Sequence, residues 1–181
     1  VESTIIDVSG ESPVILRPGA ITQEMAGEVL GMESGLDPAI TGDGPMNADV
    51  KPKAPGMKYR HYAPKADMVL VEGAMEDVVD YINREAAKAM GAGKRVGIIC
   101  TRESRDLYPQ GLLEVIGSRS QEETVAHNLF AVLRDFDDRQ VDCIFSESFS
   151  EDQLGQAIMN RLMKAAGHQV ISLGEKKDEK V

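Results

Sequence analysis

The chain has 181 residues, of which 42% are hydrophobic, which is enough for one core of ordinary size with segments left over. Its formal charge of −10 disfavours non-specific nucleic-acid binding, because an acidic surface repels phosphate backbones. The two cysteines, Cys100 and Cys143, lack metal-ligand or CxxC spacing, as is usual for free thiols in a reducing compartment. No apolar run approaches the ~20 residues that span a bilayer, and no signal peptide opens the chain. We therefore expect a cytoplasmic protein.

Two short strands are predicted first, at residues 4–8 and 13–16, with a Ser-Gly-Glu-Ser turn between them. Two short strands alone do not form a stable sheet, so we expect their partners upstream or in another chain. We therefore interpret the sequence as a piece of a longer protein.

A short helix is predicted from Thr22, as its cap, to about Leu30, with Gly31 as its stop. From Gly31 to about Lys53, Gly, Pro, Asp and Asn follow one another without an apolar period. This composition predicts a linker.

The linker ends in a basic segment. Residues 51–66 contain four lysines, one arginine and one histidine, and no acidic residue, in a chain that is acidic overall. Cations at 58, 60 and 65 and tyrosines at 59 and 62 are suited to clamping a polyphosphate and contacting a nucleotide. Pro55 and Pro64 lower the cost of ordering such a clamp. A stiff basic linker explains the same residues, and the residues alone leave both interpretations open.

After the linker, strand and helix patterns alternate. We expect strands at 68–71, 95–101, 112–117, 141–146 and 170–171, and a helix that carries Val78, Ile82 and Ala86 on one face. Capping-box spacings, Ser120 with Glu123 and Ser150 with Gln153, predict the starts of two further helices. This alternation predicts an α/β fold, with a mainly parallel sheet and helices on both faces.

Several possible motifs in this region have ordinary explanations. The glycines at 91–95 fit a helix end better than a phosphate loop, and His127 and His168 fit a helix surface and a loop. We predict no metal site and assign no catalytic residue. Ser146, Ser148 and Ser150 lie at the carboxyl end of a predicted strand, where open α/β sheets bind ligands, so a small site there stays open.

Taken together, three stretches resemble one family: STIID and VILRPGAIT at 3–7 and 14–22, PGMKYRHYAP at 55–64, and VDCIFSE with AIMNRLMKAA at 141–147 and 157–166. They resemble the long-form, two-domain L-threonylcarbamoyladenylate synthases of the YrdC family. The resemblance covers nearly the whole chain. It implies a remnant of the YrdC-like catalytic domain at 1–22, a short helix and interdomain linker at 23–66, a Rossmann-like domain at 67–174 and a charged tail at 175–181.

The resemblance also implies a reaction. The family makes L-threonylcarbamoyl-AMP and pyrophosphate from L-threonine, bicarbonate and ATP, for later modification of adenosine 37 in certain tRNAs. By motif, Ser3 would contact L-threonine, and the ATP-binding residues would be Arg17, Lys58, Tyr59, Arg60, His61 and Tyr62, with Tyr62 foremost. ATP is a substrate, with Mg²⁺ expected on its phosphates in the full-length enzyme, and tRNA is an indirect partner.

The upstream half of the catalytic domain is absent from these residues, so we expect the fragment to be inactive by itself. The same fold also fits a nucleotide or small-molecule sensor with its site near Ser146 and Ser148. A third interpretation is a protein-docking module. Direct tRNA binding ranks last because of the net charge, and the sequence favours no particular oligomeric state.

Overall fold

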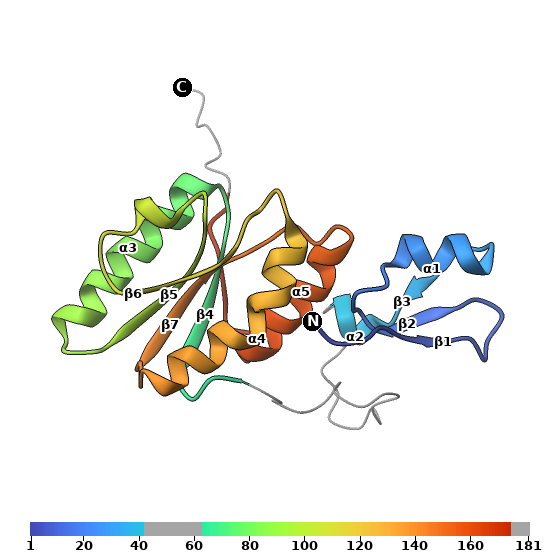
Figure 1. Cartoon of the computed structure of the whole chain (residues 1–181), viewed down its shortest axis with the longest axis horizontal. Coiled ribbons are helices and arrows are strands. Elements are labelled where there is room, and N and C mark those ends of the chain that lie inside the picture. The colour runs from blue at the N-terminus through green and yellow to red at the C-terminus, as the bar shows by residue number, and fades with distance from the viewer. Residues whose placement is uncertain (42–62, 175–181) are drawn as a thin grey trace.

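The computed structural model describes residues 1–41 and 63–174. These residues form a small three-stranded sheet, ordered β1-β2-β3, and a five-stranded sheet, ordered β6-β5-β7-β4-β8 (Figure 1). Among the described helices, none combines the length and the apolar character needed to cross a membrane.

The small sheet begins with the predicted hairpin. β1 (Ile5–Asp7) pairs antiparallel with β2 (Val14–Arg17), and α1 (Gln23–Leu30) follows. The Thr22 hydroxyl accepts a hydrogen bond from the Met25 amide at 3.2 Å, and Gly31 ends the helix with φ +69°. The predicted cap and stop of this helix are therefore confirmed.

Two expectations for this region are wrong. The stretch from Gly31 was expected to be a linker, but it contains β3 (Gly35–Leu36) and α2 (Pro38–Thr41). The hairpin was expected to find its strand partners upstream or in another chain, but β3 pairs in parallel with β2 from within this chain. Backbone pairing explains the miss, since the amide of Gly35 donates to the Pro13 carbonyl at 2.8 Å and that of Asp37 to the Ile15 carbonyl at 2.9 Å. A two-residue strand is too short to show a hydrophobic period.

The large sheet confirms the α/β prediction. Its strands are β4 (Asp67–Glu72), β5 (Val96–Thr101), β6 (Leu112–Gly117), β7 (Cys143–Glu147) and β8 (Val170–Ser172), and each neighbouring pair is parallel. The connections contain α3 (Met75–Gly91), a 3-10 turn (Arg105–Leu107), α4 (Glu122–Asp138) and α5 (Leu154–Ala165).

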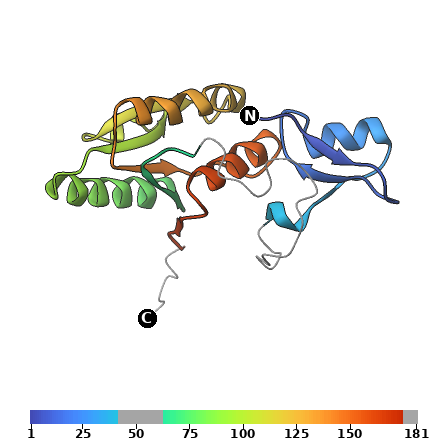
Figure 2. The same ribbon diagram turned by 90° about the horizontal axis from the view of Figure 1, so that it is seen from below.

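Helices cover both faces of this sheet, with α3 on one side and α4 on the other (Figure 2). The core under α3 is built from Val71, Val78, Ile82, Val96 and Ile98 among others. The opposite core, under α4 and α5, includes Leu70, Ile99, Leu129, Phe136, Ile144, Ile158 and Leu162. Strands β4, β5 and β7 are buried between these layers, as their continuous apolar sequences predicted.

Both predicted capping boxes are wrong. α4 begins at Glu122 after Gln121, and α5 begins at Leu154 after Gln153, and neither preceding residue makes a side-chain cap. The Ser150 hydroxyl bonds Asp152 instead. The Ser120 hydroxyl is hydrogen-bonded to the Ser118 hydroxyl at 2.9 Å instead.

Candidate functional site

Ser3 and Arg17, the two predicted site residues that the structure describes, are in direct contact. Arg17 Nε donates to the Ser3 carbonyl at 2.9 Å, and Arg17 Nη2 donates to the Ser3 hydroxyl at 3.0 Å. Arg17 is the last residue of β2, after the buried Ile15 and Leu16. We call this pair the Ser3–Arg17 corner.

Local backbone geometry positions the corner. The register between β1 and β2 shifts between Ile5 and Ile6, and such a bulge changes the direction of a side chain. Thr4 ties the segment down, because its hydroxyl donates to the Ile21 carbonyl at 2.7 Å and accepts from the Ile21 amide at 3.1 Å. A β-carbon on Gly19 would lie 2.3 Å from the Glu2 carbonyl oxygen and 2.4 Å from the Thr4 nitrogen, so only glycine fits against this backbone.

The remaining predicted ATP-binding residues lie outside the described residues: Lys58, Tyr59, Arg60, His61 and Tyr62. The chain is described again from Ala63. There the Lys65 amide donates to Asp137 Oδ1 at 2.7 Å, at the end of α4.

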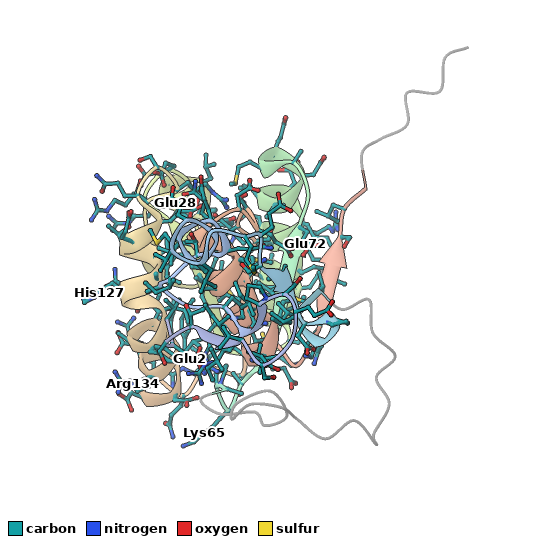
Figure 3. All side chains as sticks on the ribbon, turned by 90° about the vertical axis from the view of Figure 1, so that its right-hand side faces the viewer. Glu2, Glu28, Lys65, Glu72, His127 and Arg134 are labelled. Atoms are coloured by element: carbon teal, nitrogen blue, oxygen red, sulfur yellow. The ribbon has the colours of Figure 1, made fainter. Side chains whose placement is uncertain are left out.

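A cavity of about 420 Å³ nevertheless brings the end of the linker near the corner. Ala63, the neighbour of Tyr62 in sequence, lines it together with Glu2, the neighbour of Ser3, and with residues of α4 that include Phe130 and Arg134. Figure 3 labels Glu2, Arg134 and Lys65, which lie on the same part of the molecule in that view.

Basic side chains gather where the two sheets meet. Arg161 of α5 is 2% exposed, with its guanidinium carbon 4.8 Å from the centre of the Phe130 ring and Nη1 3.9 Å from Glu2 Oε1. Burial lowers the pKa of the neighbouring Lys164, the charges of Arg161 and Arg17 lower it further, and Glu2 opposes them. Arg17, Arg161 and Lys164 thus form a cationic junction that Glu2 partly neutralises.

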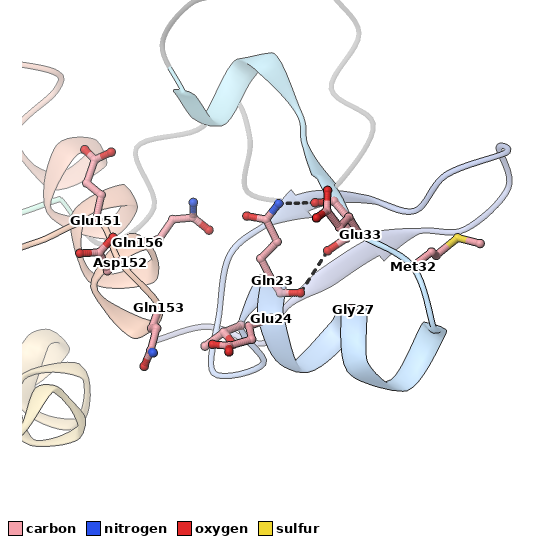
Figure 4. A pocket seen from close by; sticks show the side chains of 11 residues that line it. Gln23, Glu24, Gly27, Met32, Glu33, Glu151, Asp152, Gln153 and Gln156 are labelled. Atoms are coloured by element: carbon pink, nitrogen blue, oxygen red, sulfur yellow. Dashed lines mark hydrogen bonds between the residues drawn. The ribbon is translucent and has the colours of Figure 1, made fainter.

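Another cavity, of about 940 Å³, has a different character. It lies between α1 and the start of α5, and Figure 4 shows the side chains that line it. Four of these are carboxylates, namely Glu24, Glu33, Glu151 and Asp152, and the lining contains no lysine or arginine. A polyphosphate would be repelled there. Among the described residues, moreover, no cluster of His, Cys, Asp or Glu is arranged to hold a metal ion.

A second polar cluster surrounds the carboxyl end of β7. Glu147 is fully buried, and its carboxylate accepts hydrogen bonds from Ser104, from Tyr108 at 2.9 Å and from Arg119 Nη2 at 2.7 Å. The guanidinium carbon of Arg119 lies 4.9 Å from the centre of the Phe149 ring. Glu147 therefore holds Arg119 in a fixed position against an aromatic face. We call these residues the Glu147 cluster.

The electrostatics of the neighbouring groups follow from this burial. Burial, followed by the Glu147 charge, raises the pKa of Tyr108, which keeps its phenol protonated, and raises the pKa of Cys100 to about 12. The hydrogen bond from Ser118 lowers the pKa of Glu103 to about 2. Glu103 also accepts from the Arg119 amide at 3.2 Å, so it fixes the backbone of Arg119 while Glu147 fixes its side chain.

Of the three serines that the sequence singles out, Ser148 and Ser150 follow β7, whereas Ser146 is fully buried within β7 and its hydroxyl donates to the Glu147 carbonyl at 2.9 Å. Sequence reasoning missed Arg119, Glu147 and Gly19. Glu147 directly follows the strand predicted at 141–146 and is the last residue of the observed β7, and a charge at the end of such an apolar run is the signal that could have found it. Arg119 lies on a different loop, 28 residues away, and local patterns do not reveal such pairs.

Comparisons with known proteins agree with one another. The family model described as "Threonylcarbamoyl-AMP synthase, C-terminal domain" matches residues 21–167. Over 94% of its length the chain is 42% identical to the threonylcarbamoyl-AMP synthase of Bacillus subtilis, of which it covers 46%. For the synthase of Pyrococcus abyssi the identity is 41%, over 96% of this chain and 48% of the relative.

Solved structures give the same result. A doubly substituted Pyrococcus abyssi Sua5 superposes with a TM-score of 0.82 at 40% identity, over 96% of this chain and 47% of that one. The crystal structure of Pyrococcus abyssi Sua5 complexed with L-threonine gives 0.81 at 39% identity, over 96% and 48%. The chain spans about half the length of the curated relatives it matches. On these similarities, the chain belongs to the threonylcarbamoyl-AMP synthase C-terminal domain family.

Proposed function

We propose that this chain is the C-terminal half of an L-threonylcarbamoyl-AMP synthase that works in the cytoplasm. Its contribution is the Ser3–Arg17 corner, a linker that closes over the nucleotide and an accessory α/β domain. The observation that carries the proposal is the fixed contact between Arg17 and Ser3, within a chain 42% identical to a synthase over 94% of its length.

In the proposed reaction, the amine of L-threonine takes up bicarbonate to form a carbamate, with loss of water. A carbamate oxygen then attacks the α-phosphorus of ATP, and the bond to the leaving pyrophosphate breaks. Negative charge develops on that pyrophosphate, so a positioned arginine lowers the barrier more than it stabilises the ground state.

Ser3 and Arg17 have complementary parts in this proposal. The Ser3 hydroxyl suits the carboxylate or hydroxyl of L-threonine, and Arg17 offers the planar set of donors that phosphate oxygens accept. Because Arg17 donates to Ser3, the two substrate groups would be held in one fixed geometry. The nearby charges of Arg161 and Lys164 support an anionic ligand at this junction.

The linker would act as a lid. Lys58, Arg60 and His61 would meet the phosphates, and Tyr59 and Tyr62 the nucleotide, and closure would protect the carbamate from water. The position of Ala63 on the cavity that Glu2 also lines supports this assignment. Mg²⁺ would be bound through the ATP phosphates, and tRNA would receive the product in a later step.

The test uses the full-length protein that contains this chain, supplied with L-threonine, bicarbonate and ATP. We expect pyrophosphate release, and we expect Arg17→Lys, which loses the planar fork, to reduce kcat/KM about a hundredfold. Arg84→Lys is the matched control, because Arg84 lies on the exposed face of α3 and should leave the rate unchanged. Ser3→Ala should raise the KM for L-threonine more than the KM for ATP.

The 181-residue chain alone should release no pyrophosphate, because the upstream half of the cleft is needed to position both substrates. An inactive full-length protein, or an Arg17→Lys variant with the wild-type rate and melting temperature, would contradict the proposal.

A further inference from the structure

A cavity of about 240 Å³ lies at the edge of the five-stranded sheet where β4 and β7 end, and its lining includes neither Ser3 nor Arg17. Gly73, Met75 and Val78 line it from the start of α3. Ser148, Phe149 and Ser150 line it from the loop after β7, and Arg119 from the loop after β6. Three loops that are distant in sequence thus meet around one small cavity.

The topology of the sheet makes this the expected place for a ligand. β4 and β7 are neighbours, yet the chain leaves β4 toward α3 on one face and leaves β7 toward α5 on the other. Loops that separate to opposite faces leave a crevice between adjacent strand ends, and open α/β sheets bind ligands there. The cavity occupies this switch point.

The chemistry of the lining favours an anion. Arg119 is the one charged residue among those that line the cavity, and its guanidinium is held in place by Glu147 and Phe149. The Arg119 side chain is 31% exposed, so an oxyanion in the cavity can reach the part of the guanidinium that Glu147 leaves open.

Further donors surround the same space. α3 begins after Ala74, which supplies no side-chain cap, and the first amides of a helix have no acceptor within it. Gly73 has φ +145°, a conformation that side chains other than glycine rarely adopt, and it brings the backbone to the cavity wall. The hydroxyl of Ser148 completes the set, whereas that of Ser150 is bonded to Asp152. A carboxylate has two oxygens for these donors, whereas a phosphoryl group has three, so the donor set suits phosphate better.

We propose that this cavity is a binding site for a phosphoryl group of a small molecule, separate from the synthase site and independent of whether the proposed synthase function is correct. Arg119 provides the charge, Ser148 and the α3 amides provide neutral hydrogen bonds, and Glu147 holds Arg119 in place. An occupied site would draw the loops after β4, β6 and β7 together, which gives the accessory domain a means of sensing a phosphorylated metabolite.

Inorganic phosphate is the first probe, titrated into the isotopically labelled 181-residue chain and followed by the amide resonances of residues 73–76 and 148–150. We expect saturable shifts at these positions. Arg119→Met should weaken the affinity at least about tenfold, because it removes a charged hydrogen-bond donor. Arg139→Met, which removes an exposed arginine paired with Glu114 elsewhere, should leave the affinity unchanged.

Arg119→Met also leaves the buried Glu147 without its arginine, so a second variant guards against loss of folding. Ser148→Ala keeps that ion pair and should weaken phosphate binding about tenfold. Acetate, the carboxylate probe, should bind more weakly than phosphate. The proposal is overturned if the shifts do not saturate or if acetate binds as well as phosphate. It is also overturned if phosphate binding is lost in Arg17→Met and kept in Arg119→Met, because that result would assign the anion to the Ser3–Arg17 corner.

Discussion

At Gly97, the second residue of β5, a β-carbon would lie 2.6 Å from a ring carbon of Phe136. Phe136 is fully buried in the core under α4, so its ring has little room to move. We therefore expect Gly97→Ala to reduce the free energy of unfolding by about 1–3 kcal/mol, as overpacking does in well-filled cores. Urea unfolding followed by circular dichroism measures the change.

The same substitution at Gly91 is the control. Gly91 ends α3, a β-carbon there would have no atom within 4 Å, and its φ is not positive. Gly91→Ala should be neutral or stabilising by about 0.5–1 kcal/mol. Equal effects at the two positions would show that the Phe136 ring does not limit the space at Gly97.

Single residues also mark how far the sequence can predict the site. Ser3 and Arg17 were identified by motif, and their contact is a consequence of strand pairing that no local pattern contains. Arg119 and Glu147 were missed because their meaning depends on two loops brought together by the sheet. Apolar periodicity predicts which residues are buried, whereas buried polar pairs depend on tertiary contacts.

Among the elements, α1 offers the clearest test of a prediction made from local sequence. Thr22→Ala removes the hydroxyl that accepts from the Met25 amide, and we expect it to destabilise α1 by about 1 kcal/mol. Hydrogen exchange of the α1 amides should become faster by about fivefold, whereas the α4 amides should not change.

Ser120→Ala is the counterpart, since the sequence predicts a cap there and the structure shows none for α4. It should leave the first turn of α4 unchanged in the same exchange experiment. Fast exchange throughout that turn would mean that Ser120 caps the helix after all. The contrast has a physical origin: Thr22 faces an isolated helix end, whereas the Ser118 hydroxyl donates to Glu103 and the Ser120 hydroxyl is bonded to Ser118.

The same scale explains which elements the sequence predicted. Strands β4 to β7 and helices α3, α4 and α5 have long apolar patterns, and each was expected within a few residues of its place. β3 and α2 were missed because they are short and depend on backbone pairing with β2. Pattern reasoning succeeds where an element buries its own face and fails where a neighbour's backbone determines it.

For the molecule as a whole, the contact between the two sheets includes the pair Glu2–Arg161, in which Arg161 is 2% exposed. The backbone nitrogen of Val1 also donates to the Ala126 carbonyl at 2.9 Å, so the first residues are held against both α4 and α5. The Ser3–Arg17 corner directly follows this anchor. Its position relative to the large sheet should therefore depend on Glu2.

Glu2→Gln tests this dependence. It removes the carboxylate next to an arginine that is 2% exposed, and the cost should be about 1–3 kcal/mol, because Glu2 itself is 29% exposed and partly screened. Glu11→Gln, in the exposed turn of the hairpin, is the matched control and should cost nothing measurable.

A second measurement separates electrostatics from packing. Glu2 raises the pKa of Lys164 against the effects of burial and of Arg161, so Glu2→Gln should lower that pKa further in an NMR titration. An unchanged Lys164 pKa together with wild-type stability would mean that Glu2 does not hold the two sheets together, and the Ser3–Arg17 corner would then need another anchor to the linker that we expect to close over it.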